Sequence, residues 1–187
     1  LTEYQQRTKD AVLAADTAPA PAPWKLVRQH WHDGSTIAIG FSKCEEFLIG
    51  TDIESRWLIS TRTGEVQFDE SGASSETWWD YDSLSVIGFG SLDGQVIRTS
   101  GQFGAAAGFH SSTDDGWAIH EFRSTYCHIH IILDSPDSRL FCREPKFTKL
   151  TTIDSTLIAI GFTPSATKLV VIERDTFSIW SRQADAT

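Results

Sequence analysis

Short apolar runs alternate with polar, glycine-rich turns from Trp24 to the end of the chain. Within the runs apolar residues recur at every second position, the period of a β-strand, and no window of a dozen residues keeps a helical period. β-Branched and aromatic residues fill the runs, whereas Gly, Asp, Ser and Pro separate them. The first unit of this pattern predicts strands at residues 36–41, 47–50, 56–61 and 66–69, and the last predicts strands at 157–162, 169–173 and 177–182.

An internal repeat underlies this pattern. Three nearly identical tripeptides are Ile39-Gly40-Phe41, Ile87-Gly88-Phe89 and Ile160-Gly161-Phe162, with a degenerate copy at His120-Glu121-Phe122. An aliphatic residue follows each Phe by seven positions, and an Asp with a small residue precedes it by seven or eight. The aliphatic residues are Leu48, Val96, Ile129 and Leu169, and the turn pairs are Asp33-Gly34, Asp82-Ser83, Asp115-Gly116 and Asp154-Ser155. We therefore expect four equivalent units with their four phenylalanines almost fully buried.

The ends of the chain suggest how these units assemble. The last unit is one strand short, and the strand-like segment Trp24–Trp31 precedes the first unit without a partner of its own. An N-terminal strand that fills the last sheet would close a ring. The sequence therefore predicts an all-β fold, a small β-propeller of about four four-stranded blades over residues 24–187. Gly40, on the opposite strand face from Ile39 and Phe41, predicts another layer packed closely there.

Residues 1–23 differ from the rest. Residues 1–16 contain good helix formers and predict a weak helix, and the alternating Ala-Pro run 18–23 predicts a stiff, extended spacer. The composition predicts a flexible helical and Ala-Pro arm. The alternative is a short helix held away from the domain to dock on a partner.

The charge and composition of the chain limit the classes of partner that it is expected to bind. The chain has 187 residues, a net charge of −9 and a pI near 5.0. This acidic balance disfavours nucleic acid and anionic membranes and favours a protein partner with a basic patch. No apolar run approaches the length of a membrane helix, and three cysteines are too few for a disulfide framework, so we expect a cytoplasmic protein. The chain contains no Met, so a removed targeting segment stays open.

The repeat resembles the WD-repeat β-propeller family. The best matches are Ile39-Gly40-Phe41-Ser42 with Leu48 and the turn 60–66, then Phe162-Thr163-Pro164-Ser165 with Leu169 and Ile179-Trp180. No unit ends its third strand in Trp-Asp, and the Gly-His pair of the family is absent. The resemblance implies a propeller that binds proteins through its loops. The family usually has more blades, so a larger ring completed by another chain, or self-association of an incomplete ring, stays open.

A second resemblance is to fucose-binding propeller lectins, which meet the sugar with Arg, Glu and Trp between blades. Arg56-Trp57, Trp180 and Arg182 supply some of these residue types, but no Glu recurs at a fixed position of the repeat. Carbohydrate binding is therefore the alternative function.

Catalytic motifs are absent from the sequence, so we expect neither an enzyme nor a cofactor. A zinc-dependent enzyme is the third hypothesis, because His120, His128 and His130 lie close in sequence to Cys127 and Cys142. His120, however, occupies the packing position that Ile39, Ile87 and Ile160 fill elsewhere. Ordinary strand histidines are therefore the simpler interpretation.

The strongest candidate binding segment is Trp78-Trp79-Asp80-Tyr81, which lies in the longest spacing between repeats. Three aromatic rings within four positions cannot all face one core from a short strand, and Trp and Tyr are frequent anchors of protein interfaces. We expect these four residues to contact the partner. The alternative is that the rings cover the hydrophobic edge of a blade.

Overall fold

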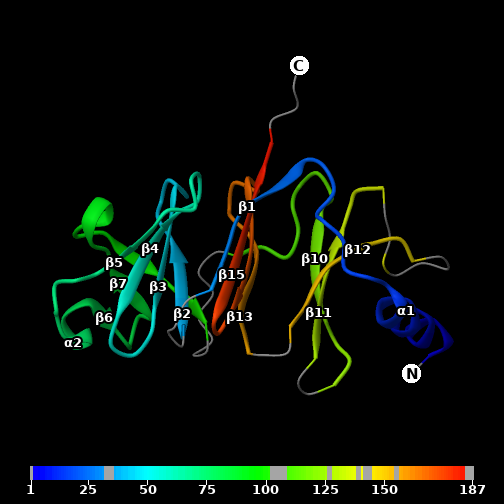
Figure 1. Cartoon of the computed structure of the whole chain (residues 1–187), viewed down its shortest axis with the longest axis horizontal. Helices are drawn as coiled ribbons and strands as arrows, with labels where there is room; N and C mark the ends of the chain where they lie inside the picture. The colour runs from blue at the N-terminus through cyan, green and yellow to red at the C-terminus, as the bar shows by residue number, and fades with distance from the viewer. Residues whose placement is uncertain are drawn as a thin grey trace.

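The computed structural model describes residues 2–31, 36–101, 109–125, 128–137, 140, 145–153 and 156–183. They are mostly β-strands, and they form four antiparallel sheets (Figure 1). The sheets are numbered by their order along the chain, and the strands of each sheet are named in spatial order. The first sheet contains β5 (Val66–Phe68), β4 (Arg56–Ser60), β3 (Phe47–Thr51), β2 (Ala38–Phe41) and β9 (Ser100–Gly101). The second contains β6 (Trp79–Asp80), β7 (Ser85–Ile87) and β8 (Val96–Arg98). The third contains β10 (Ala118–Arg123), β11 (Ile129–Asp134) and β12 (Thr148–Ile153), and the fourth contains β1 (Trp24–Trp31), β15 (Thr176–Arg182), β14 (Lys168–Glu173) and β13 (Leu157–Phe162).

β1, the N-terminal strand, pairs with the C-terminal strand, as the sequence predicts. β1 pairs antiparallel with β15 from Trp24 opposite Arg182 to Trp31 opposite Thr176, with one irregularity between Leu26 and Arg28. The N-terminal strand therefore completes the last sheet. The expectation of four strands in every sheet is wrong, because the second and third sheets have three strands and the first has five.

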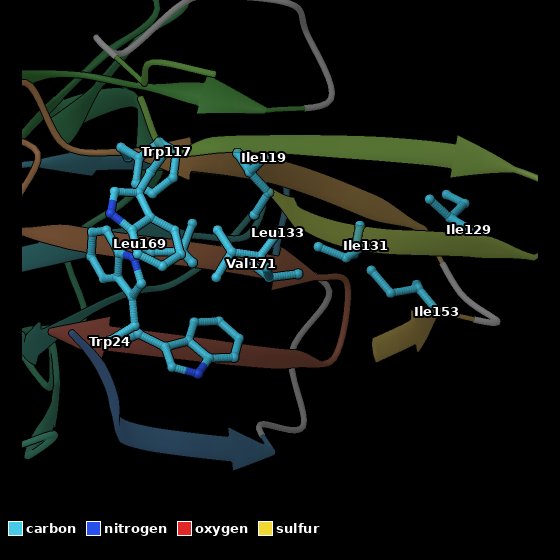
Figure 2. Close-up of a cluster of buried hydrophobic side chains, with 11 residues drawn as sticks. Trp24, Trp117, Ile119, Ile129, Ile131, Leu133, Ile153, Leu169 and Val171 are labelled. Atoms are coloured by element: carbon cyan, nitrogen blue, oxygen red, sulfur yellow. The ribbon is translucent and has the colours of Figure 1, made fainter. Parts of the chain in front are cut away.

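The four sheets lie in a row, in the order second, first, fourth, third (Figure 1). A separate cluster of buried apolar side chains fills each of the three junctions. Ile49 of the first sheet packs with Val86 of the second, and Trp57 of the first stacks on Phe177 of the fourth at 5.8 Å. Between the fourth and third sheets, Leu169 and Val171 lie against Trp117, Ile119 and Leu133 (Figure 2). No such cluster of described residues joins the second sheet to the third.

Turn geometry confirms the repeat in the first and fourth units. Ser42 N donates to Phe47 O at 3.0 Å, and Phe47 N donates back to Ser42 Oγ at 3.1 Å. In the fourth unit Thr163 N donates to Lys168 O at 3.0 Å, and Lys168 N donates to Thr163 Oγ1 at 3.2 Å. Each turn also holds one residue in the left-handed region, and the equivalent pair is Glu45 (φ 57°) and Ala166 (φ 56°).

The predicted register of the second unit is wrong. The β3–β4 turn is closed by Asp52, which accepts from Glu54 N and Ser55 N, and the β6–β7 turn is closed in the same way by Asp80. β6 and β7 therefore correspond to β3 and β4, not to the first strands of a unit. Val96, which the predicted repeat aligns with the buried Leu48, Ile129 and Leu169, is accordingly 65% exposed. The identical Ile-Gly-Phe string misled the alignment because turn chemistry, rather than that tripeptide, marks the unit.

The repeated phenylalanines are buried to different degrees. Phe162 and Phe89 are buried, as expected, whereas Phe41 and Phe122 are only half-buried. Phe41 lies at the rim of its cluster against Phe109, with ring centroids 5.2 Å apart. Nearly complete burial is therefore correct for two of the four positions. The predicted turn pairs Asp33-Gly34 and Asp154-Ser155 lie outside the described residues.

Residues 2–20 are packed against the third sheet and do not form the loose arm that composition predicts. Helix α1 (Glu3–Ala14) begins with a capping box of Thr2 and Gln5, and its Val12 is fully buried in a cluster with Ile132 and Leu140. Beyond the helix, Thr17 forms a parallel bridge with Lys149, and Ala18 N donates to Lys149 O at 2.8 Å, so the start of the Ala-Pro run pairs with the edge of β12. Figure 1 shows α1 beside β12 at the end of the row.

Lys149 fixes the end of this helix. Its side chain is buried, and its Nζ donates to Val12 O at 3.1 Å. The last carbonyls of a helix lack partners within the helix and carry its negative dipole end, so a cation there is favourable. α1 has no basic residue in its own last turn, and β12 supplies one.

Two glycines allow other parts of the chain to lie close against the central sheets. After β8 the chain pairs briefly with β2 through β9, and His110 then pairs with Phe162 of β13. A Cβ on Gly40 would clash with the backbone oxygen of Arg98, and one on Gly161 would lie 3.0 Å from His110 O. The closely packed layer predicted beside Gly40 is therefore confirmed, and it is the end of β8 in the second sheet.

Replacing Lys149 with Met should loosen α1, because Val12 O would then be buried without a donor. We expect a loss of about 1–3 kcal/mol in the stability of helix docking, seen as faster amide hydrogen exchange throughout α1. Lys25→Met, on the exposed face of β1, is the matched control and should leave that exchange unchanged. Equal protection of α1 in both variants would contradict the capping role.

Candidate functional site

The junction of the first and second sheets is built around a buried cation. The Arg56 side chain is 9% exposed, and its Nε donates to Asp69 Oδ2 at 2.7 Å. The guanidinium lies over the ring of Trp78 at 5.3 Å and over that of Phe89 at 5.1 Å, and its Nη1 donates to Ile87 O. An arginine can serve all these partners because its planar fork offers five donors while its faces stack on aromatic rings.

Asp69 is held ionised in this cluster. Burial disfavours the carboxylate, but hydrogen bonds from Ser71 N and from Arg56 outweigh burial and hold the pKa of Asp69 below its usual range. The charged pair therefore bridges β4 to the residues that follow β5, and Arg56 continues across to the second sheet.

Trp78 and Trp79 are core residues, so the prediction that both rings contact a partner is wrong. They are 3% and 5% exposed and belong to the cluster between the first and second sheets. Trp78 ends the short helix α2 (Ser75–Trp78), and its Nε1 donates to Ala73 O at 3.1 Å. The change from helix to strand at this point breaks strand alternation, which lets two consecutive rings enter one core. The alternative interpretation, rings that cover a blade edge, is nearer to the structure.

Asp80 and Tyr81 are exposed, as predicted, and the Asp80 carboxylate also closes the β6–β7 turn by accepting hydrogen bonds. Asp80 Oδ2 accepts from Ser83 Oγ at 2.6 Å, and the hydrogen bonds from Ser83 and from the Asp82 backbone hold the pKa of Asp80 below its usual range. Tyr81 is 55% exposed, and its ring lies 5.6 Å from that of the buried Trp79. The Tyr81 ring is therefore exposed to solvent but packs against a buried side chain.

Sequence reasoning missed the counterpart of Tyr81. Ile53 occupies the same position in the equivalent β3–β4 turn and is 67% exposed. Acidic residues flank both side chains: the turns read Asp52-Ile53-Glu54-Ser55 and Asp80-Tyr81-Asp82-Ser83. The shared Asp-x-acidic-Ser pattern is the signal that could have revealed the pair.

Exposed apolar side chains concentrate on these two sheets. Among the described residues, five large exposed ones lie between positions 53 and 96, whereas two lie elsewhere, in α1 and β1. The five are Ile53, Phe68, Tyr81, Ile87 and Val96. Scattered exposed apolar residues are normal on a protein surface, so what distinguishes these five is that they belong to two neighbouring sheets.

The histidines of the zinc hypothesis do not converge. His130 is 7% exposed, and hydroxyls occupy both its ring nitrogens: Thr152 Oγ1 lies 3.0 Å from Nδ1 and Ser124 Oγ lies 3.0 Å from Nε2. Burial lowers the pKa of His120, and the nearby Asp134 charge only partly opposes this. His128 lies exposed before β11. Within the described ranges no group of three His, Cys, Asp or Glu residues could hold a metal ion, and Cys127 and Cys142 lie outside those ranges.

A second charged pair closes the junction of the fourth and third sheets. Arg182 Nη2 donates to Asp115 Oδ2, and the guanidinium lies 5.9 Å from the ring centroid of Trp24. The hydrogen bonds from Arg182 and Thr113 lower the pKa of Asp115 to about 2. Beside this pair lies an open cleft of about 470 Å³ between the turns at 112–115 and 163–166.

The residues that carry the lectin resemblance are engaged in sheet packing. Trp57 and Trp180 are buried, Arg56 is enclosed between Trp78 and Phe89, and Arg182 is paired with Asp115. No tryptophan lines the cleft beside Asp115. Trp24 and Trp180 line another open cleft, of about 510 Å³, together with Lys25 and Gln29, but neither Arg56 nor Arg182 is among its lining residues.

Comparison with known protein families and with curated protein sequences finds no match. None of the described helices is long and apolar enough to cross a membrane.

Replacing Arg56 with Met should strongly destabilise the fold, because it leaves the Asp69 carboxylate buried without its cation. Breaking a buried ion pair in this way costs about 3–5 kcal/mol. Chemical denaturation measures the loss. Arg123→Met is the matched control: its pair with Glu121 is about half-exposed, so we expect about 0–1 kcal/mol. Similar losses for the two variants would show that the Arg56 cluster is not buried as described.

The lowered pKa of Asp115 makes part of the stability depend on pH. A carboxylate whose pKa is lower in the folded state stabilises that state above its unfolded pKa, near 3.8, and loses this contribution as the pH falls through about 2. Asp115 is 43% exposed, so solvent screening reduces the effect to under about 1 kcal/mol. Asp115→Asn should therefore melt at a lower temperature than the wild type at pH 6, and the difference should shrink toward pH 2. A difference that is constant across this range would contradict the assignment.

Proposed function

We propose that the chain forms four consecutive blades of a WD-repeat-like β-propeller arc and acts as a non-catalytic protein-interaction module. Three features support the propeller: the N-terminal strand in the last sheet, the repeated hairpin turns of the first and fourth units, and the order of the sheets. The order second, first, fourth, third is that of neighbours in a ring. The row opens between the second and third sheets, so an arc fits better than a closed ring of four.

The observation that carries the binding function is the pair of equivalent turns with exposed Ile53 and Tyr81. Hydrogen bonds from the turn backbone to Asp52 and Asp80 hold the two turns in the same conformation on neighbouring sheets. A rigid turn that displays an apolar side chain loses little conformational entropy on binding. The turns therefore supply two pre-formed apolar anchors.

The charge around the anchors indicates the kind of partner. Each apolar side chain is flanked by two carboxylates, and the whole chain carries a net charge of −9. Lys and Arg side chains would pair with these carboxylates while an aliphatic or aromatic group contacts Ile53 or Tyr81. The partner that fits is a protein segment with alternating basic and apolar residues.

Selection from a displayed random-peptide library tests this proposal. We expect enriched peptides to combine Lys or Arg with large apolar residues, and to bind more weakly as salt rises. Ile53→Ser with Tyr81→Ser should weaken the selected peptides at least tenfold, about 1.4 kcal/mol, in titration calorimetry, without lowering the melting temperature. Neither change touches the Asp-Ser hydrogen bonds that close the turns.

Leu26→Ser is the matched control, because Leu26 is 45% exposed on β1, away from both turns. It should leave peptide affinity unchanged. If the library yields no binder, or if binders lose affinity equally in both variants, the turns are not the binding surface.

A further inference from the structure

The second sheet has one covered face and one open face. Trp79 pairs with Val86, and Val86 with Ile97, and all three side chains are buried toward the first sheet. The alternate residues face the other way, and they form two rows across the strands. Asp80, Ser85 and Arg98 form the polar row, in which Asp80 and Arg98 are exposed and the central Ser85 is buried; Ile87 and Val96 form the apolar row.

The open face contrasts with the other end of the row. There the outward face of the third sheet is covered by α1, whose Val12 is buried against Ile132. On the second sheet Ile87 is 40% exposed and Val96 is 65% exposed. Stacked sheets bury their faces against neighbours, and terminal units need a polar or covered outer face to stay soluble. Ile87 and Val96 therefore mark an end of the stack that lacks such a cover.

The polar row makes this face complementary to itself. Asp80 lies on β6 at one edge, Arg98 lies on β8 at the other edge, and β7 runs between them. A twofold axis parallel to β7, in the plane of contact, would bring Asp80 of one copy opposite Arg98 of the other, twice. The same rotation places Ile87 against its own counterpart. Like charges would meet nowhere along this row.

We propose that a second copy of this chain docks on the open face of the second sheet and forms an isologous dimer about that axis. Twofold dimers are the commonest assemblies of soluble proteins, and they need only one self-complementary patch. Three short strands offer less area than the roughly 1,200–2,000 Å² buried by stable complexes. The dimer is therefore weak and depends on concentration. This inference does not rest on peptide binding by the Ile53 and Tyr81 turns.

Sedimentation equilibrium over a wide range of concentrations tests the dimer. The mass of the wild type should rise from that of one chain toward twice that value, with half-association above about 1 μM. Val96→Glu should keep the protein monomeric, and Leu26→Glu, a matched change of an exposed apolar residue on β1, should leave the association unchanged. A wild type that remains monomeric throughout overturns the proposal.

Charge reversal tests the axis. Arg98→Asp sets two carboxylates opposite each other, and Asp80→Lys sets two cations opposite each other, so each variant alone should associate at least tenfold more weakly. An equal mixture of the two variants should associate again, because every pair then carries opposite charges. Association that either single variant retains, or a mixture that stays monomeric, would contradict the twofold arrangement. The Asp80→Lys variant loses the hydrogen bonds that close its turn. If it does not fold for that reason, the Arg98→Asp variant is the test, and unchanged association of that variant overturns the proposed axis.

Discussion

The arrangement of the sheets depends on the contact between the two central sheets and the segment that connects the second sheet to the third. The chain passes from the second sheet to the third, at the opposite end of the row, and the described residues of this crossing segment pair with the first sheet at β9 and with the fourth sheet at His110. Gly161 makes room for it, because a Cβ there would lie 3.0 Å from the His110 oxygen, and Gly40 lets the end of β8 approach β2 just before the crossing begins. In return β9 pairs with β2, and His110 exchanges two hydrogen bonds with Phe162. The crossing thereby covers strand edges that would otherwise be left unpaired.

Apolar clusters drive the sheets together, but charged groups fix how they meet. Hydrophobic burial is not directional, and each junction could slide if it were the only force. Arg56 at one junction and Arg182 at another have planar groups that accept few alternative positions, because each must meet a carboxylate and an aromatic face at once. Glu45 adds a further link, since its carboxylate accepts from Ser165 N at 2.9 Å in the neighbouring turn.

Most strands could be predicted from the sequence, because alternation and turn residues are local signals. Trp24–Trp31 and its pairing with the last unit followed from counting strands. The contacts that define the junctions could not be predicted in the same way. The residues Trp78 and Trp79 do not reveal by themselves that a helical turn places both rings in one core. The register of the second unit depends on the turn that Asp80 closes, and not on the conspicuous Ile-Gly-Phe tripeptide. Candidate site residues failed where tertiary burial, invisible to local patterns, decided exposure.

Native-state amide hydrogen exchange at His110 and Phe162 tests the crossing most directly. Each amide donates to the other residue's carbonyl, at 2.9 and 2.8 Å, although the two residues lie far apart along the chain. The structure predicts that both protons exchange slowly and together, with protection close to that of the β13–β14 ladder. If the His110 amide exchanged at the rate of an unstructured chain while β13 stayed protected, the crossing would not hold the central sheets, and the order of the row would lose its physical basis.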